Sequence, residues 1–274
     1  MIRFLRKNPS AIIAVIIVFG LIFVAVFAPF IAPYDPIEIK PVIRLQPPSR
    51  NHLFGTDNAG RDIFSRVIWG ARISLRIGFI VVTVAMIVGT LFGMTSAYLG
   101  GILDEIMMRI ADIFLAFPYL VFAIAITAAL GRGIENVTLA LAIVWWPAYS
   151  RLIRSRVLEI KELDYIEAAV AGGAGHFVIL FKHILPNAIS PVIIQGSIDF
   201  GQAIIFAAGL SFIGLGVQPP TPEWGAIVTE GSKYMREAWW YATFPGLTIL
   251  ITVMGFNVLG DALRDFLDPR LHNL

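Results

Sequence analysis

The sequence contains four long stretches without a charged side chain, and they constrain the fold more than any other feature. They cover residues 8–34, 77–103, 113–131 and 238–260. A helix needs about 20 apolar residues to cross ~30 Å of hydrocarbon at 1.5 Å per residue. The chain is 57% hydrophobic before its 24 glycines are counted, whereas ordinary globular domains reach about 45–50% with glycine included. We therefore predict a protein embedded in a membrane.

Two further stretches bring the predicted number of membrane-spanning helices to six. Residues 136–150 form a short span that must borrow a turn from Gly133 or let the stem of Arg151 reach toward the headgroups. Residues 191–216 are long enough, but they place Asp199 within the membrane. The predicted fold class is an all-α membrane protein with six transmembrane helices. It divides into an N-terminal tail and first helix (1–30), an extracytoplasmic segment with an interfacial helix (31–73), and a core of five helices (74–274) with a cytoplasmic loop at 151–190.

The charges at the amino terminus predict how the chain is oriented. Arg3, Arg6 and Lys7 precede the first apolar stretch, which is too long for a secretory signal and has no A-x-A cleavage site. We expect an uncleaved anchor with the amino terminus in the cytoplasm. Six crossings then return the carboxyl terminus to the same side.

The segment after the first helix departs from the positive-inside rule, because seven Lys and Arg residues fall between Lys40 and Arg76. Residues 61–75 carry apolar and charged side chains in an amphipathic helical pattern. We predict a helix in the outer interface with its arginines toward headgroups and water. A second amphipathic helix is predicted from Trp224 to Met235, ahead of the last span.

The cytoplasmic stretch at 151–190 is too long and too apolar for a simple connector. Apolar residues recur at helical intervals from Val157 to Val170, and Gly172-Gly173 then predicts a turn. A second helical piece is predicted over 174–184, ending at Leu185-Pro186-Asn187, because proline removes a backbone donor. This elbow is either a self-packed helical hairpin or a surface that a cytoplasmic partner covers.

The elbow carries a motif of known spacing. Glu167-Ala168-Ala169 is followed after three residues by Gly173 and, nine residues later, by His183-Ile184-Leu185-Pro186. This pattern resembles the EAA loop of ABC-importer permeases, in which an aliphatic residue takes the place of His183. The segments 53–62, 100–112, 218–225 and 260–270 resemble the C-subunit permeases of dipeptide and oligopeptide importers. Together these segments extend the resemblance over nearly the whole chain.

The resemblance implies a type I importer-like permease fold in which the elbow is a coupling helix seated in a groove of a separate ATPase. Glu167 would be a charged contact, the small side chains of Ala168 and Ala169 would allow close approach, and Gly173 would permit the sharp turn. His183, Leu185 and Pro186 complete the motif. The implied partners are a homologous permease in a heteromeric pair, two cytoplasmic ATPases that bind ATP and Mg, an extracytoplasmic binding protein, a peptide substrate and membrane lipid. The implied location is the cytoplasmic membrane of a bacterium or archaeon.

The sequence predicts a transporter and not an enzyme. No lysine lies in a phosphate-binding sequence of the form G-x-x-x-x-G-K-[ST], so ATP hydrolysis is expected on another chain. We identify no catalytic or cofactor-binding residue, and His52, His176, His183 and His272 show no metal-binding spacing. The net charge is +2 and no Lys/Arg cluster is long enough to bind a nucleic acid, which argues against that function.

One alternative energy source is an ion gradient, for which a buried ionisable residue would be the evidence. Gln195, Asp199 and Gln202 fall at i, i+4 and i+7 of one predicted helix and form a polar stripe. The stripe either lines the substrate path, with Asp199 attracting a substrate amine, or packs against a neighbouring helix. A further alternative is a membrane assembly protein that moves nothing. The sequence leaves open whether the substrate is a dipeptide, a longer peptide, a glutathione-like compound or nickel.

Overall fold

The structure is a computed structural model that describes residues 8–267, and most of these residues are helical. No strand occurs in this part of the chain, so the predicted all-α class is confirmed. In chain order the elements are α2 (Pro9–Val26), α3 (Ala28–Ile31), η1 (Pro41–Ile43), α4 (Ile63–Leu99), α5 (Gly101–Leu115), α6 (Tyr119–Leu130), α7 (Ile134–Lys161), α8 (Asp164–Ala171), α9 (His176–Val178), η2 (Ile179–Ile184), α10 (Leu185–Ala188), α11 (Ser190–Phe212), α12 (Trp224–Ser232) and α13 (Trp240–Leu267).

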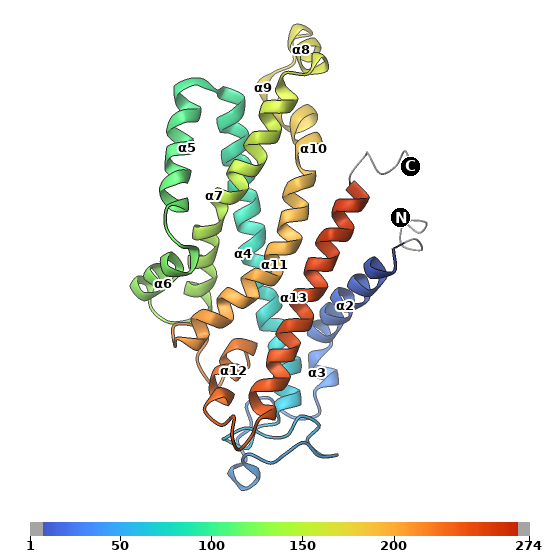
Figure 1. Ribbon diagram of the computed structural model, residues 1–274, viewed down its shortest axis with the longest axis vertical. Helices are drawn as coiled ribbons and strands as arrows, with labels where there is room; N and C mark the ends of the chain where they lie inside the picture. Colours follow the sequence, from blue (N-terminus) through green and yellow to red (C-terminus); the bar gives the residue numbers. More distant parts are fainter. Residues whose placement is uncertain (1–7, 268–274) are drawn as a thin grey trace.

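The long helices run along one axis of an elongated molecule (Figure 1). Helix α8 lies at one end, which we call the elbow end, and α12 lies toward the opposite end with the segment between α3 and α4. The amino end of α2 and the carboxyl end of α13 both point toward the elbow end. The predicted location of both termini stays a prediction, because residues 1–7 and 268–274, with Asp268, Pro269 and Arg270, lie outside the described residues.

The predicted count of six spans differs from what the described helices provide. Four of them, α2, α4, α11 and α13, are long and apolar enough to cross a membrane, and α5 with α6 makes a fifth if this pair is one span. The pair is bent by 86°, so the stretch predicted at 113–131 is not a straight helix. Pro118 lies at the bend in an extended conformation, where its ring disfavours a continuous helix. Helix α7 contains the sixth predicted span, but its charged second half lowers its hydropathy.

Helices α4 and α7 pack along each other at close range. An added Cβ at Gly93 of α4 would lie 2.0 Å from the Ser150 carbonyl oxygen, and one at Gly89 would lie 2.3 Å from the Trp146 carbonyl oxygen. Small residues let two membrane helices approach to backbone contact. The Trp146 ring meets Phe92 edge-on at 4.7 Å between centroids. The two helices therefore form the centre of the largest core cluster.

Helix α4 corrects the prediction of a separate interfacial helix at 61–75. The Asp62 side chain caps its amino end by accepting a hydrogen bond from the Ser65 backbone N–H at 2.7 Å, and the helix continues for 37 residues. The predicted boundary at residue 73 falls inside it. Arg66 is fully buried and Arg61 is 4% exposed, so these two arginines do not face headgroups. Only Arg72 of the three in this stretch is exposed.

A charged cluster at the end opposite the elbow explains why those arginines are buried. We define it as Asp57, Arg61, Arg66, Glu230 and Tyr241. The Asp57 carboxylate accepts hydrogen bonds from Arg61 Nε at 2.5 Å and from Arg66 Nη1. Glu230 of α12 accepts from Arg66 Nη2 and from the Tyr241 hydroxyl, both at 2.9 Å. Burial lowers the pKa of Arg61, but the charges of Asp57 and Glu230 outweigh it and raise that pKa above its ordinary value.

The second predicted amphipathic helix is present as α12, although it ends at Ser232 and not at Met235. The Glu223 carboxylate caps it by accepting from the backbone N–H groups of Gly225 and Ala226 at 2.8 Å each. Trp224 is fully buried and donates its indole N–H to the Val67 carbonyl at 2.9 Å. These contacts hold α12 against α4.

Candidate functional site

The elbow consists of two limbs joined by the predicted glycine turn. The first limb is not one helix as predicted, because α7 ends at Lys161 and α8 begins at Asp164 after an extended Leu163. Gly173 has φ of +79°, a conformation that side chains other than glycine rarely adopt. Its backbone N–H donates to the Val170 carbonyl at 2.9 Å and closes the end of α8. The sequence motif therefore places glycine where the turn needs it.

The second limb does not end at Leu185-Pro186-Asn187, and that prediction is wrong. It continues from α9 through six π-helical residues, η2, into α10 and on to α11. Pro186 lies in the first turn of α10, where its missing N–H disrupts the backbone hydrogen bonds of the helix least. The Asn187 side-chain amide donates to the His183 carbonyl at 2.7 Å. The wider π-helical turn before the proline lets the limb remain helical.

Side chains of the elbow expose a mixed apolar and acidic surface. Glu167 and Ala168 on α8 are exposed and Ala169 is half-buried, while Ile166 on the same helix is 4% exposed and anchors it. Large apolar side chains are exposed around them. We define the elbow surface as Leu163, Glu167, Ala168, Val170, Phe177 and Phe181, of which Phe177 is 71% exposed. Exposed apolar patches of this kind mark interaction sites.

The rest of the motif lies on the second limb, which Tyr165 connects to the first by hydrogen bonds. His183 and Leu185 are half-buried and Pro186 is exposed. The Tyr165 hydroxyl of α8 donates to the His183 carbonyl at 3.4 Å and accepts from the Asn187 amide at 3.3 Å. The structure thus groups Glu167, Ala168, Ala169 and Gly173 at α8 and connects them to His183 through Tyr165.

Two contacts that the sequence reasoning missed attach the elbow to α4. The Tyr98 hydroxyl and His176 Nδ1 are 2.7 Å apart, and their rings meet edge-on at 5.6 Å. Lys161 Nζ donates to the Ala97 carbonyl at 3.4 Å. The only sequence signal was that Tyr98 lies near the end of the charge-free stretch 77–103, two residues before a pair of glycines. A polar group at that position can hydrogen-bond outside the hydrocarbon.

Helix α5 is attached to α7 by two ion pairs. The Asp104 carboxylate accepts from Arg154 Nε at 2.8 Å and Nη2 at 2.6 Å, and Asp112 pairs with Arg151. A bidentate arginine–carboxylate pair fixes orientation as well as distance. The resemblance had singled out 100–112 without indicating these partners.

The predicted polar stripe on α11 is only partly assembled. Gln195 Nε2 donates to Asp199 Oδ1 at 2.9 Å, and Asp199 is 5% exposed. Gln202 is exposed on the helix surface and joins neither. A substrate-path role for the three residues stays a prediction. Within residues 8–267 no group of three or more His, Cys, Asp or Glu side chains is placed to hold a metal ion.

Comparisons with known proteins agree with the fold. A family model described as a binding-protein-dependent transport system inner membrane component matches residues 89–273, and one described as the N-terminal TM domain of oligopeptide transport permease C matches residues 1–48. The chain belongs to the family of binding-protein-dependent transport system inner membrane components. It is a membrane permease subunit of the ABC-importer class, as the resemblance implied.

Individual relatives cover nearly all of the chain. A dipeptide transport system permease protein of Alkalihalophilus pseudofirmus is 46% identical over 97% of this chain and 88% of its own. A probable D,D-dipeptide transport system permease protein of Escherichia coli is 45% identical, over 97% and 89%. A glutathione transport system permease protein of Pectobacterium atrosepticum is 47% identical, over 98% and 89%. A solved methionine ABC transporter in an inward-facing conformation shares the fold, with a TM-score of 0.62 at 19% identity over 75% of this chain and 98% of that chain.

Proposed function

We propose that this chain forms half of the translocation path of an ATP-driven importer of peptides and is driven by a separate ATPase through the elbow surface. The relatives named for dipeptides and glutathione support a short peptide as substrate. The observation that carries the proposed coupling is the exposure of Glu167, Ala168 and four large apolar side chains on an element that projects from the bundle (Figure 1). Such a surface is stabilised when a partner groove covers it.

The position of the elbow in the chain supports this coupling. Helix α8 lies between α7 and the limb that leads into α11, so a displacement of α8 is passed to two long helices. Tyr165 connects α8 to the second limb, and Tyr98 connects that limb to α4. In our proposal, closure of the ATPases moves the elbow and biases the bundle between inward-facing and outward-facing arrangements.

The proposed assembly has further parts. A homologous permease completes the path in a heteromeric pair, and two cytoplasmic ATPases bind ATP and Mg. A binding protein delivers substrate at the end opposite the elbow. The membrane is the cytoplasmic membrane of a bacterium or archaeon, with both termini on the elbow side. Gln195, Asp199 and Gln202 are proposed to contribute to the path, and His183, Leu185 and Pro186 to transmit the elbow's motion.

Glu167→Lys tests the coupling in the complete assembly, reconstituted in vesicles with the ATPases and the binding protein. We expect normal assembly, peptide uptake reduced at least about tenfold, and loss of the stimulation of ATPase activity by the binding protein, because a charge reversal on α8 opposes its groove. Glu162→Lys is the matched control, since Glu162 is exposed two residues before α8 begins. Wild-type uptake by Glu167→Lys would contradict the coupling role.

The same vesicles separate this proposal from a gradient-driven transporter that uses Asp199. Uptake that requires ATP on the ATPase side and is indifferent to an ionophore supports the proposal. Uptake that an ionophore abolishes and ATP does not restore would favour the gradient, although the relatives' names do not favour it. Asp199→Asn then reports whether the buried carboxylate is needed for transport itself.

A further inference from the structure

Two arginines lie one turn apart on α4 without an acidic partner. Within the described residues neither Arg72 nor Arg76 forms an ion pair, and Arg72 lies over the Trp69 ring at 5.2 Å from its centroid. Arg76 is the last charged residue before the charge-free stretch 77–103. The pair therefore marks the level at which α4 enters the hydrocarbon, in the first half of that helix. Helix α4 begins at the end of the molecule opposite the elbow (Figure 1).

An apolar groove of ≈ 680 Å³ begins at this pair. Side chains of α2 form one wall, Leu75 and Phe79 of α4 form the other, and Phe200 and Phe256 form the remaining lining. The Phe200 and Phe256 rings are stacked at 3.9 Å between centroids, and Phe79 is 63% exposed. Among the described residues, the two arginines are the only charged side chains that line the groove, so its lining is apolar apart from two positive charges.

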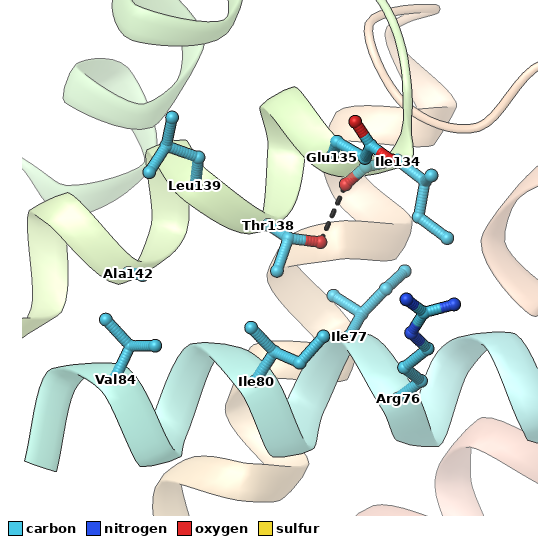
Figure 2. Close-up of a pocket in the computed structure, with 9 residues that line it drawn as sticks. All are labelled: Arg76, Ile77, Ile80, Val84, Ile134, Glu135, Thr138, Leu139 and Ala142. Atoms are coloured by element: carbon cyan, nitrogen blue, oxygen red, sulfur yellow. Dashed lines mark hydrogen bonds between the residues drawn. The ribbon is translucent and has the colours of Figure 1, made fainter.

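The groove on the other side of α4 has a different charge pattern. Figure 2 shows Arg76 at one end of that groove, which runs between Ile77, Ile80 and Val84 of α4 and the residues of α7. It is smaller, at ≈ 280 Å³, and Glu135 lies at the same end as Arg76. An anionic ligand is repelled by Glu135 there, whereas none of the described residues that line the groove beside α2 is a carboxylate.

We propose that the α2-side groove binds one anionic phospholipid, with the phosphate between Arg72 and Arg76 and an acyl chain along Phe79 and the Phe200–Phe256 pair. Guanidinium groups bind phosphate oxygens bidentately. With the phosphate held there, the acyl chain lies against the apolar side chains of the groove. The site is independent of the transported substrate and of the elbow. This proposal gives a binding role to Arg72 and Arg76, the two arginines of α4 that do not belong to the charged cluster.

The first test measures lipid binding to the complete purified assembly after its native lipids are removed. Phosphatidylglycerol, phosphatidylcholine with the same chains, and inorganic phosphate are the three probes. We expect phosphatidylglycerol to be the one probe that binds tightly. Arg72→Gln combined with Arg76→Gln should weaken its binding about 30-fold, because each arginine contributes ~1 kcal/mol to the binding of an anionic lipid. Arg132→Gln is the control, since Arg132 is an exposed arginine that does not line the groove.

Equal affinity of the double variant and the wild-type assembly would overturn the proposal. Binding of inorganic phosphate as tight as that of phosphatidylglycerol would also overturn it, because the acyl chain would then contribute nothing. A second arm identifies what covers the groove in the membrane. Phe79→p-benzoylphenylalanine is expected to cross-link on irradiation to a phospholipid, as seen by mass. A cross-link to the second permease or to another polypeptide would assign the groove to a protein interface instead.

Discussion

The two ends of this permease solve opposite packing problems. At the end opposite the elbow, the charged cluster buries Asp57, Arg61 and Arg66 at no more than 4% exposure and pairs each of them with an opposite charge. At the elbow end, Phe177 and Val170 are more than half exposed, and nothing within residues 8–267 covers them. The first end pairs its buried charges internally, whereas the second exposes apolar side chains that we propose a partner covers.

The energetic consequences differ in the same way. Removing one member of a buried ion pair leaves the other charge buried without compensation, so the stability of the cluster depends on each carboxylate. The elbow depends on single hydrogen bonds and on one glycine conformation, each of which contributes far less. Substitutions at the two ends should therefore separate stability from coupling.

The largest effect is expected for Asp57→Ala. The variant leaves the two buried arginines, Arg61 and Arg66, with Glu230 as their one remaining carboxylate partner among the described residues. It should reduce the free energy of unfolding by about 3–5 kcal/mol. Thermal unfolding of the purified protein in detergent measures this loss. Asp35→Ala is the control in the same segment, because Asp35 makes only an exposed contact with the Ile37 backbone N–H at 2.9 Å. Equal melting temperatures for the two variants would show that the cluster does not stabilise this end.

An intermediate effect is expected for Gly173→Ala. A Cβ at φ of +79° costs about 1–2 kcal/mol and should loosen the turn after α8 without unfolding the bundle. Hydrogen exchange of the α8 amides should increase and peptide uptake should fall. Gly175→Ala is the matched control, since Gly175 has φ of −69° and both positions have open space around an added Cβ. If both variants behaved alike, the turn conformation would not matter for coupling.

The smallest effect is expected for Tyr98→Phe. Loss of the 2.7 Å hydrogen bond to His176 should weaken the attachment of α9 by about 0.5–1.5 kcal/mol. Faster hydrogen exchange confined to α9 and η2 is the measurement. Tyr34→Phe removes a hydroxyl of similar type at the other end, where it donates to Asn51 O at 3.0 Å. Unchanged exchange in α9 would mean that the ring contact alone holds the limb.

What the sequence predicts well is local. The turn at Gly172-Gly173 and the exposed apolar face of the elbow follow from residues a few positions apart, and both are present. Burial of Arg66 depends on Glu230, which lies 164 residues away in the sequence. An amphipathic pattern at 61–75 fits either a surface helix or a buried one, and the pairing of its arginines with Asp57 and this distant carboxylate decides between them.

Hydropathy also does not determine how the apolar stretches are bent or joined. The stretch at 113–131 contains Pro118, whose position favours a kink without fixing its angle, and the helices diverge by 86° there. Pro186 behaves in the opposite way from Pro118. It was predicted to end a helix, and it lies instead in the first turn of α10. The His183 carbonyl finds a donor in Asn187, which a proline rule alone does not anticipate.

Helix α7 gives the elbow a long lever arm. Its 28 residues correspond to about 42 Å of rise, and it packs against α4 at backbone distance along Gly89 and Gly93. A tilt of about 10° about its far end sweeps the elbow through about 7 Å, by the geometry of a rod of that length. A small tilt of α7 within the bundle and a large displacement of the elbow are thus the same movement. A spectroscopic label on either the helix or the elbow would report on both.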